Sequence, residues 1–302
     1  MIRLPDFAGA PLYGRKYKLI IGTDDNSGIE VSELHCIFTV EKSMTLDPNP
    51  SIIQIFNLSP NTRNIILTQG QRIIIAAGYE GPQFGLIFDG DIVRPLKRGT
   101  KSINRITELI AQDGDVFLNK GFISVSYSSG QDARSIIEDM AGVADPDISI
   151  GSVSENLSGT TLARGKVLFG QAKDYARKIA KGEGALCYVC DRQIHLVKPA
   201  DLPTDEIVDL SPSSGLIGTP EQTEDGIKAS CLLNPLINLN KLVHVDNDLV
   251  QQDASAGALT TGIYKIISLV HKGDTRGQDW YTEFTGIAQP GRVPLTGESF
   301  NT

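Results

Sequence analysis

Short apolar runs that alternate with polar residues, separated by turn residues, dominate the first third of the chain. This pattern predicts strands over residues 15–22, 29–41, 51–57, 71–79, 83–96 and 102–113. Ser59 followed by Pro60 is typical of a helix start, with serine as the N-cap and proline in the first turn, so a short helix is expected over 61–68. Residues 1–115 are therefore predicted to form a β-barrel or sandwich domain.

A different period marks the middle of the chain. Apolar residues spaced by three and four positions recur over 133–141 and over 172–180, which places each set on one face of a helix. Two strand-like runs, 186–190 and 194–197, follow and are joined by a polar turn that starts at Asp191. Residues 116–205 are thus predicted to form a small α/β domain with helices packed on a hairpin. The two helix faces consist of Ala133, Ile136, Ile137, Met140 and Ala141, and of Ala172, Tyr175, Ala176, Ile179 and Ala180.

Strand-like alternation returns from about Leu210. Strands are predicted over 241–245, 262–271 and 280–288, a polar loop over 247–261, and no regular structure after Pro290. The layout echoes the first domain, most clearly where Thr107-Glu108-Leu109-Ile110-Ala111 is matched by Thr282-Glu283-Phe284-Thr285-Gly286. Duplication of one β domain is favoured, and coincidental similarity between two β domains is the alternative.

Length and composition set the broad class. The 302 residues suffice for two or three domains, and 40% hydrophobic with 21% charged residues is typical of a globular protein. No signal peptide and no apolar run of about 20 residues stands out, so synthesis in the cytoplasm and no membrane-spanning segment are expected. The net charge of -8 argues against a general nucleic-acid coat. The four cysteines are expected to be reduced.

Motifs that would carry chemistry are few and incomplete. Cys187 and Cys190 have the spacing of a redox or zinc pair, yet residues three apart in a strand point to opposite faces, so two buried core thiols are favoured. Asp89-Gly90-Asp91 and Asp113-Gly114-Asp115 lack the further ligands of a calcium loop and are interpreted as turns at strand ends. For His271, beside a polar turn, a structural role is favoured. The sequence therefore predicts no catalytic residue, metal ligand or cofactor site.

Two features concern surfaces. A basic cluster surrounds a predicted hairpin turn, and a solvated loop is favoured over a polyanion site. Trp280, the only tryptophan, has two equally weighted interpretations, an anchor in a contact with another protein or a plug at the end of a β-barrel. The basic cluster consists of Arg94, Lys97, Arg98, Lys101 and Arg105.

Characteristic strand and turn segments occur in both outer domains. In the first domain they are Phe56-Asn57-Leu58-Ser59-Pro60, Gly70, Gly78-Tyr79 and Phe88-Asp89-Gly90-Asp91-Ile92. In the last third they are Gly215 to Ile227, Leu232-Leu233-Asn234-Pro235, Tyr264 to Asp274, and Trp280-Tyr281-Thr282. Together these segments resemble the baseplate hub proteins of tailed bacteriophages, over most of the chain and least in its middle.

This resemblance implies a β-rich α+β fold, with two tube-like β-barrel domains (1–115 and 206–302) flanking the small α/β domain (116–205). It implies a structural protein of the virion tail baseplate, with no enzymatic activity and no cofactor. Three chains are then expected to form a homotrimeric, pseudo-sixfold ring that adapts the hexameric tail tube to the trimeric central spike. Expected partners are the tail tube or tube-initiator protein, the spike and other baseplate proteins. Phage DNA is expected only in transit through the channel, and no stable membrane association is expected.

Two other functions stay open at the level of sequence. A tail-associated cell-wall-degrading enzyme would need a carboxylate pair or a metal cluster, and none stands out. A secretion-system spike component would share the architecture of the hub. For the hub, the candidate contact residues are Lys97, Arg98, Lys272, Gly273, Asp274 and Trp280.

Overall fold

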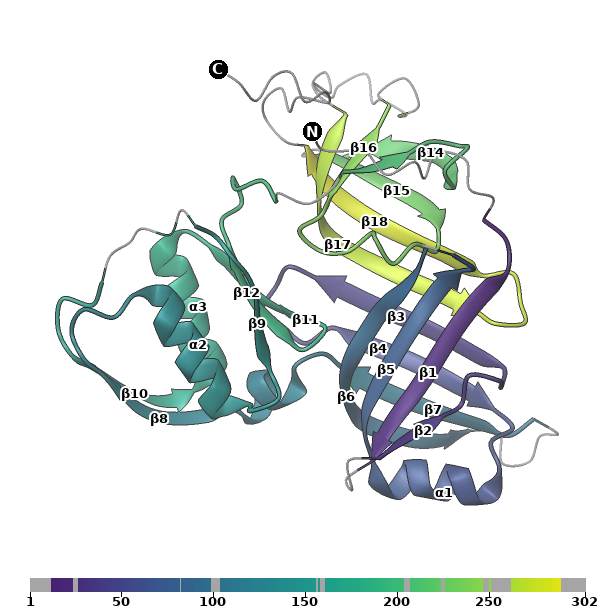
Figure 1. The fold of residues 1–302 in the computed structure, drawn as a ribbon, viewed down its shortest axis with the longest axis horizontal. Helices are drawn as coiled ribbons and strands as arrows, with labels where there is room; N and C mark the ends of the chain where they lie inside the picture. Colours follow the sequence, from purple (N-terminus) through teal and green to yellow (C-terminus); the bar gives the residue numbers. More distant parts are fainter. Residues whose placement is uncertain are drawn as a thin grey trace.

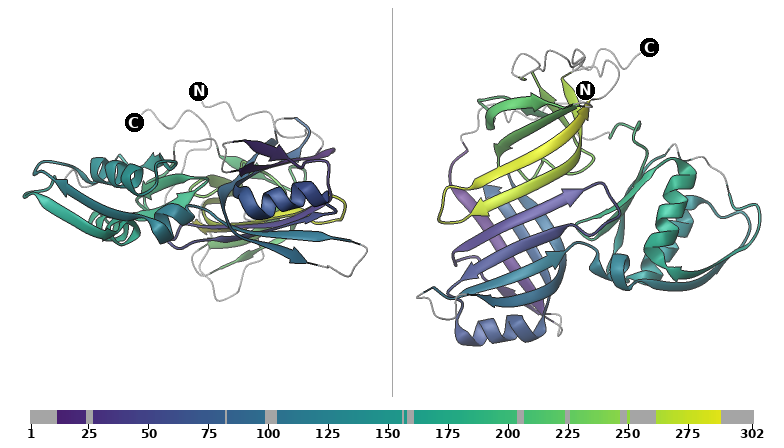
Figure 2. Two further views of the ribbon diagram at one scale, coloured as in Figure 1. Left: turned by 90° about the horizontal axis from the view of Figure 1, so that it is seen from below. Right: turned by 180° about the vertical axis from the view of Figure 1, so that it is seen from behind.

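The computed structural model describes residues 12–23, 27–81, 83–98, 104–155, 157, 161–203, 207–223, 226–246, 250 and 262–288. The predicted loop over 247–261, the tail after Pro290 and Lys101 of the basic cluster lie, wholly or almost wholly, outside these residues. Figure 1 shows two β units one above the other, with a third unit that carries two helices at their side. Figure 2 shows the same lateral position of the third unit from two more directions.

The first β unit contains seven strands and one helix. They are β1 (Arg15–Thr23), β2 (Gly28–Glu30), β3 (Cys36–Ser43), β4 (Pro50–Phe56), α1 (Pro60–Gln69), β5 (Gly70–Tyr79), β6 (Phe84–Arg98) and β7 (Ile106–Gln112). Helix α1 begins as predicted, because the Ser59 hydroxyl accepts a hydrogen bond of 3.1 Å from the backbone N–H of Thr62. The prediction of a single strand over 29–41 is wrong. A turn after Glu30 divides it, and the Ser32 hydroxyl in this turn accepts from the N–H of Leu19.

The second β unit repeats this strand-rich composition without a helix among its described residues. Its strands are β13 (Val208–Leu210), β14 (Leu216–Gln222), β15 (Gly226–Leu232), β16 (Leu242–Val245), β17 (Ile263–Asp274) and β18 (Trp280–Ala288). The last three strands agree closely with the predicted ranges.

The middle unit combines helices and short strands. Its elements are η1 (Val116–Lys120), β8 (Phe122–Tyr127), α2 (Ala133–Ala144), β9 (Ser149–Val153), β10 (Lys166–Gln171), α3 (Ala172–Glu183), β11 (Leu186–Cys190) and β12 (Gln193–Val197). Both predicted helices are confirmed, and their buried residues belong to the predicted faces. The predicted hairpin is confirmed as β11 and β12, which pair from Leu186 opposite Val197 to Cys190 opposite Gln193. No helix among the described residues is both long and apolar enough to cross a lipid bilayer.

One sheet runs through both β units. Its order is β14-β15-β18-β17-β3-β4-β7-β6-β5-β1-β2, with β16 beside β17 and β13 beside β16. The β-rich class predicted from sequence is confirmed. The described strands form an open path, however, and no pairing among them closes either β unit into a barrel.

Three hydrophobic clusters form the interior. One lies mainly in the first β unit, one mainly in the second β unit, and one beneath the helices of the middle unit. Cys187 packs in the cluster of the middle unit and Cys190 in that of the second β unit, so the two thiols diverge as predicted. All four cysteines are buried and free.

Candidate functional site

The two β units are joined edge to edge by strands β3 and β17. These strands pair antiparallel, from Ser268 opposite Ser43 to Asp274 opposite Ile37. Gly273 faces the ring of Phe38 so closely that a Cβ atom on Gly273 would lie 2.2 Å from the ring carbon Cζ. The absence of a side chain at Gly273 therefore lets the two units approach each other.

Trp280 lies on the inner side of this junction. Its indole is 2% exposed, packs edge-on against Phe38 at a centroid distance of 5.6 Å, and donates a hydrogen bond of 3.2 Å from Nε1 to the carbonyl of Gly78. The side chain thus connects the second β unit to the core of the first.

The two β units have the same strand order. The first reads β3-β4-β7-β6-β5 and the second reads β14-β15-β18-β17-β16. The hairpins β6–β7 and β17–β18 also share a register irregularity, between Ile92 and Arg94 in one and between Ile266 and Ser268 in the other. The duplication predicted from the sequence is therefore confirmed in the pairing of five strands.

The shared irregularity fixes which residues correspond in the two units. Arg98 corresponds to Lys272 and Glu108 to Glu283, and each unit forms an ion pair at these positions. The Arg98–Glu108 contact is 2.8 Å and the Lys272–Glu283 contact is 3.1 Å. The same correspondence aligns the two segments whose similarity was predicted from sequence, because Thr107 corresponds to Thr282. The units differ at the next strand, because β1 runs antiparallel to β5 whereas β13 runs parallel to β16.

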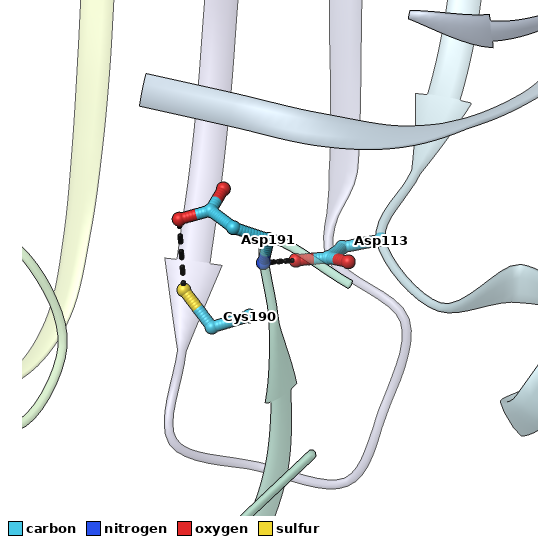
Figure 3. Close-up of side chains that lie close together, drawn as sticks. All are labelled: Asp113, Cys190 and Asp191. Carbon is cyan, nitrogen blue, oxygen red and sulfur yellow. Dashed lines mark hydrogen bonds between the residues drawn. The ribbon is translucent and has the colours of Figure 1, made fainter. Parts of the chain in front are cut away.

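The middle unit docks against both β units through the turn of its β11–β12 hairpin. Asp191 and Arg192 form this turn with positive φ angles of 52° and 58°. The carboxylate of Asp113, which follows β7, accepts hydrogen bonds from the backbone N–H groups of both turn residues, at 3.0 Å for Arg192. Figure 3 shows the hydrogen bond between the backbone nitrogen of Asp191 and the Asp113 carboxylate. The guanidinium of Arg192 in turn binds the carboxylate of Asp91 in β6.

A buried ion pair closes the contact. The Lys42 ammonium on β3 lies 2.6 Å from the Asp191 carboxylate, and the Lys42 side chain is only 3% exposed. Burial lowers the pKa of Lys42, but the Asp191 carboxylate outweighs this effect, so the pKa is raised overall and the amine stays charged. Burial and the nearby Asp191 charge raise the pKa of Asp113 to about 7. Asn238 of the second β unit also contacts Asp191, at 3.4 Å.

Asp113, Cys190 and Asp191 lie close enough together to suggest a metal site, with candidate ligand atoms within 4.8 Å of one another. Their donors are already used. Asp113 accepts two backbone hydrogen bonds, Asp191 holds the Lys42 ammonium, and burial raises the pKa of the Cys190 thiol well above its ordinary value. Because a metal needs deprotonated ligands and no competing cation, these residues fit a structural junction better than a metal centre.

The cavity beside this junction is small. It has a volume of about 170 Å³ and is lined by residues of the middle and second β units, among them Tyr188, His195 and Asn238. Pockets for drug-sized ligands usually span about 300 to 1,000 Å³. Burial lowers the pKa of His195 to about 4, so its ring is neutral at physiological pH. The cavity therefore offers room for a few water molecules, and the carboxylate that lines it, Asp191, is held by the Lys42 ammonium.

Both acidic motifs were predicted to be turns at strand ends, and this prediction is correct for one of them. Asp113-Gly114-Asp115 forms a turn after β7, as predicted, with Gly114 at a φ of 63°. Asp89-Gly90-Asp91 is instead in the middle of β6, so its interpretation as a turn is wrong. Its carboxylates are fixed by arginines: Arg72 binds Asp89 at 2.6 Å, and Arg192 binds Asp91. His271 is buried and lies 2.8 Å from the Thr282 hydroxyl, which is a structural role.

The predicted contact residues occupy two kinds of position. Lys97 and Arg98 are exposed at the end of β6. Lys272 and Asp274 are partly buried near the end of β17, where the Asp274 carboxylate accepts from the N–H groups of Arg276 and Gly277. Gly273 and Trp280 face the interior, as described above. That any of these six residues contacts another protein stays a prediction.

Comparisons with known proteins identify a family and structures of similar fold. The model of a family described as baseplate hub gp41 matches residues 23–281. A search of curated protein sequences found no match. Among solved structures, the fold is similar to the prophage MuSo2 43 kDa tail protein from Shewanella oneidensis, with a TM-score of 0.60 and 9% identity over 92% of this chain and 99% of that one.

Two further structures show the same fold. A tail protein from Neisseria meningitidis MC58 has a TM-score of 0.58 and 10% identity, over 91% of this chain and 97% of that one. The E. coli c3393 protein, described as a component of the type VI secretion system, has a TM-score of 0.58 and 13% identity, over 86% of this chain and 76% of that one. At these identities the likeness establishes the fold alone.

Proposed function

The chain belongs to the baseplate hub gp41 family, and from this membership and the fold we propose that three copies form a ring that adapts the hexameric tail tube to the trimeric central spike of a phage tail. A structural role in the phage tail follows from the family. The trimer, the ring and the symmetry match are the proposal.

The duplicated β unit is the observation that carries this proposal. Each chain contains two units with the same order of five strands and the same register irregularity in the corresponding hairpins. Three chains would therefore present six similar units, and a ring of six units matches a hexamer while the chains themselves match a trimer. A chain with one such unit would need six copies to do the same.

The arrangement of the units supports a tube wall with lateral projections. The shared sheet of the two β units would line the ring, as two tube-like halves, and the middle unit would project outward. This division follows the ranges 1–115, 116–205 and 206–302, of which the second boundary lies in residues that the structure does not describe. The lateral position of the middle unit in Figures 1 and 2 is compatible with this arrangement.

The assembled ring would occupy the tail baseplate of the virion. The tail tube or a tube-initiator protein would bind one side, the central spike the other, and further baseplate proteins the outer surface. Phage DNA would pass the central channel without a stable complex. We propose no enzymatic role, since the buried charges near Asp191 are used for docking the middle unit.

Mass and shape in solution test this proposal. The purified protein should have the native mass of three chains, and negative-stain images should show a ring with a central opening. A protein that stays monomeric at every concentration, alone and with tail tube protein added, would contradict the proposal. A monomer that also clears peptidoglycan would favour the alternative of a cell-wall-degrading enzyme. Native complexes with a spike but no ring would favour a secretion-type spike component.

A further inference from the structure

Besides the short outer strands β2 and β13, each β unit has a strand edge without a strand partner among the described residues. Strand β6 pairs with β5 only as far as Asp91, so from Ile92 to Arg98 it has β7 on one side and an open edge on the other. Strand β14 has β15 on one side and ends the sheet on the other. Open edges are templates for pairing with another strand, so they need either protection or a partner.

We infer that the open edge of β6 pairs antiparallel with β14 of a second copy of this chain, with Arg98 opposite Glu221 of the other copy. This inference rests on the proposed trimer and names the contact that would close it. Three copies would then have six junctions of one kind: three within chains, between β17 and β3, and three between chains, between β6 and β14.

The junction inside the chain supplies the template. In the duplicated units β17 corresponds to β6, because both follow the same register irregularity and both are paired on the far side by equivalent strands. Strand β3 corresponds to β14, because each lies beside an equivalent strand, β4 or β15. Since β17 pairs with β3 within the chain, the equivalent β6 edge fits the equivalent β14 edge.

The residue register follows from the same correspondence. Within the chain, Lys272 of β17 lies opposite Thr39 of β3. Lys272 corresponds to Arg98, as shown above. Thr39 corresponds to Glu221, because Thr39 pairs with Ile52 and Glu221 pairs with Lys228, which occupy equivalent places beside β7 and β18. The template therefore places Arg98 opposite Glu221.

Charge favours this register. Arg98 and Glu221 are both exposed in the single chain, and opposite charges directly across two antiparallel strands attract each other. The neighbouring edge residues Arg94 and Lys97 are also exposed and basic. The template pair, Lys272 with Thr39, has no such charge complementarity, so the Arg98–Glu221 match is independent of the correspondence that predicts it.

Two departures from the template are accommodated. Strand β14 has a register irregularity between Ile217 and Glu221, which lies before Glu221 and leaves its pairing with Lys228 intact. Strand β6 contains Pro95, which lacks a backbone donor, so at most one hydrogen bond of the new ladder is lost there.

A second copy is the occupant that the topology favours. Within one chain β6 and β14 are separated by six strands, and seven steps of about 4.8 Å span roughly 34 Å along the sheet. Figure 1 likewise shows β14 and β6 at opposite ends of the β units. Both edges belong to every copy, so a head-to-tail contact between copies would satisfy them together and close into a ring.

Disulfide cross-linking tests the register. The variant Arg98→Cys with Glu221→Cys, oxidised at low protein concentration, should shift from monomer to covalent trimer on a non-reducing gel. Leu96→Cys with Thr223→Cys should do the same, two residues along the strands, and serves if the first variant folds poorly. Lys272→Cys with Thr39→Cys is the positive control, because this template pair lies within the chain and gives an oxidised monomer.

The matched negative control is Lys97→Cys with Glu221→Cys. Adjacent residues of a strand point to opposite faces, so this pair should stay uncross-linked. Native mass under reducing conditions tests the trimer separately from the pairing of β6 with β14. A native trimer without covalent trimers in either test pair, or with equal cross-linking in the negative control, overturns the pairing and leaves the proposed trimer intact. Covalent ladders beyond three chains overturn the closed ring. A monomer in all conditions overturns both.

Discussion

The buried Lys42–Asp191 pair should determine how firmly the middle unit is held. We consider Asp191→Asn, which keeps the shape of the side chain and tolerates the positive φ of 52° at this position. The substitution removes the only carboxylate within hydrogen-bond distance of the Lys42 ammonium in the part of the chain that the structure describes. Lys42 then keeps a contact of 3.4 Å with the amide oxygen of Asn238.

The expected cost can be bounded in two ways. At 2.6 Å and an effective dielectric constant of about 20, the Coulomb attraction is about 6 kcal/mol, against a desolvation cost of several kcal/mol per ion. Alternatively, the unpaired amine can lose its proton, which at pH 7 costs at most about 5 kcal/mol for a lysine of ordinary pKa. Removal of one partner of a buried pair typically costs about 3 to 5 kcal/mol. We therefore expect Asp191→Asn to lower the free energy of unfolding by about 3 to 5 kcal/mol at pH 7.

The assay is urea unfolding followed by two signals. Circular dichroism reports on the whole chain, and the fluorescence of Trp280, the only tryptophan, reports on the junction of the β units. Agreement between the signals shows whether a two-state treatment applies. The double variant Lys42→Met with Asp191→Asn should cost clearly less than the sum of the two single changes, because neither charge is then buried alone. The exposed pair Arg134–Glu138 gives the control, in which Arg134→Ala should change stability by less than about 0.5 kcal/mol.

Two outcomes would refute this reasoning. One is a single-variant cost below about 1 kcal/mol, which would mean that water reaches the pair. The other is additivity in the double variant, which would mean that the two side chains act independently. A further signature is pH dependence: the cost of Asp191→Asn should decrease toward pH 10, where a lysine of ordinary pKa loses its proton in the unfolded chain as well.

Two more predictions concern the junction of the β units. Gly273→Ala places a methyl group 2.2 Å from the buried Phe38 ring and should lower the melting temperature through a loss of about 1 to 3 kcal/mol, whereas Gly182→Ala in α3, where the methyl group meets nothing within 4 Å, should raise it. Equal effects would contradict the role given to Gly273. Burial lowers the pKa of His271 from 6.5 to about 3, so its contribution to stability is complete above pH 6.5 and is lost as the pH falls toward 3. In urea titrations at several pH values, His271→Asn should flatten this acid limb, and an unchanged slope would show that other groups cause it.

The parts of the fold that sequence predicted well are those with one buried face. The faces of α2 and α3 and the strands β17 and β18 show a clear period because one side of each packs on a core. Strands β8 and β10 were missed. In β10, Val167 and Phe169 are 70% and 68% exposed while only Leu168 is buried, so the apolar residues do not mark the inner face. Alternation along a sequence marks a strand only when one of its faces is buried, and β10 has a single buried residue.

The polar junction was missed for a different reason. Asp113 and Asp191 are 78 positions apart, and Lys42 is 149 positions from Asp191. Each carries an ordinary local signal, a turn or a strand end, and their contact depends on how the middle unit docks. The prediction of a turn at Asp89-Gly90-Asp91 is wrong because Arg72 and Arg192 compensate the two negative charges inside a strand. Long-range compensation of this kind leaves no trace in local composition.

The junction within the chain and the equivalent junction proposed between chains differ in their side chains, in a way that fits their proposed roles. The junction within the chain is apolar and closely packed, with Gly273 against Phe38 and Trp280 behind them. The two edges that would meet between chains carry the features by which single chains avoid indiscriminate strand pairing: exposed Arg94 and Lys97 with Pro95 on β6, and a register irregularity on β14. These features weaken pairing with an arbitrary strand. Pairing with an edge that presents Glu221 opposite Arg98 would lose at most one hydrogen bond at Pro95 and would gain the attraction between these two charges. The same residues would thus keep the free chain soluble and select the second copy of the chain as the partner.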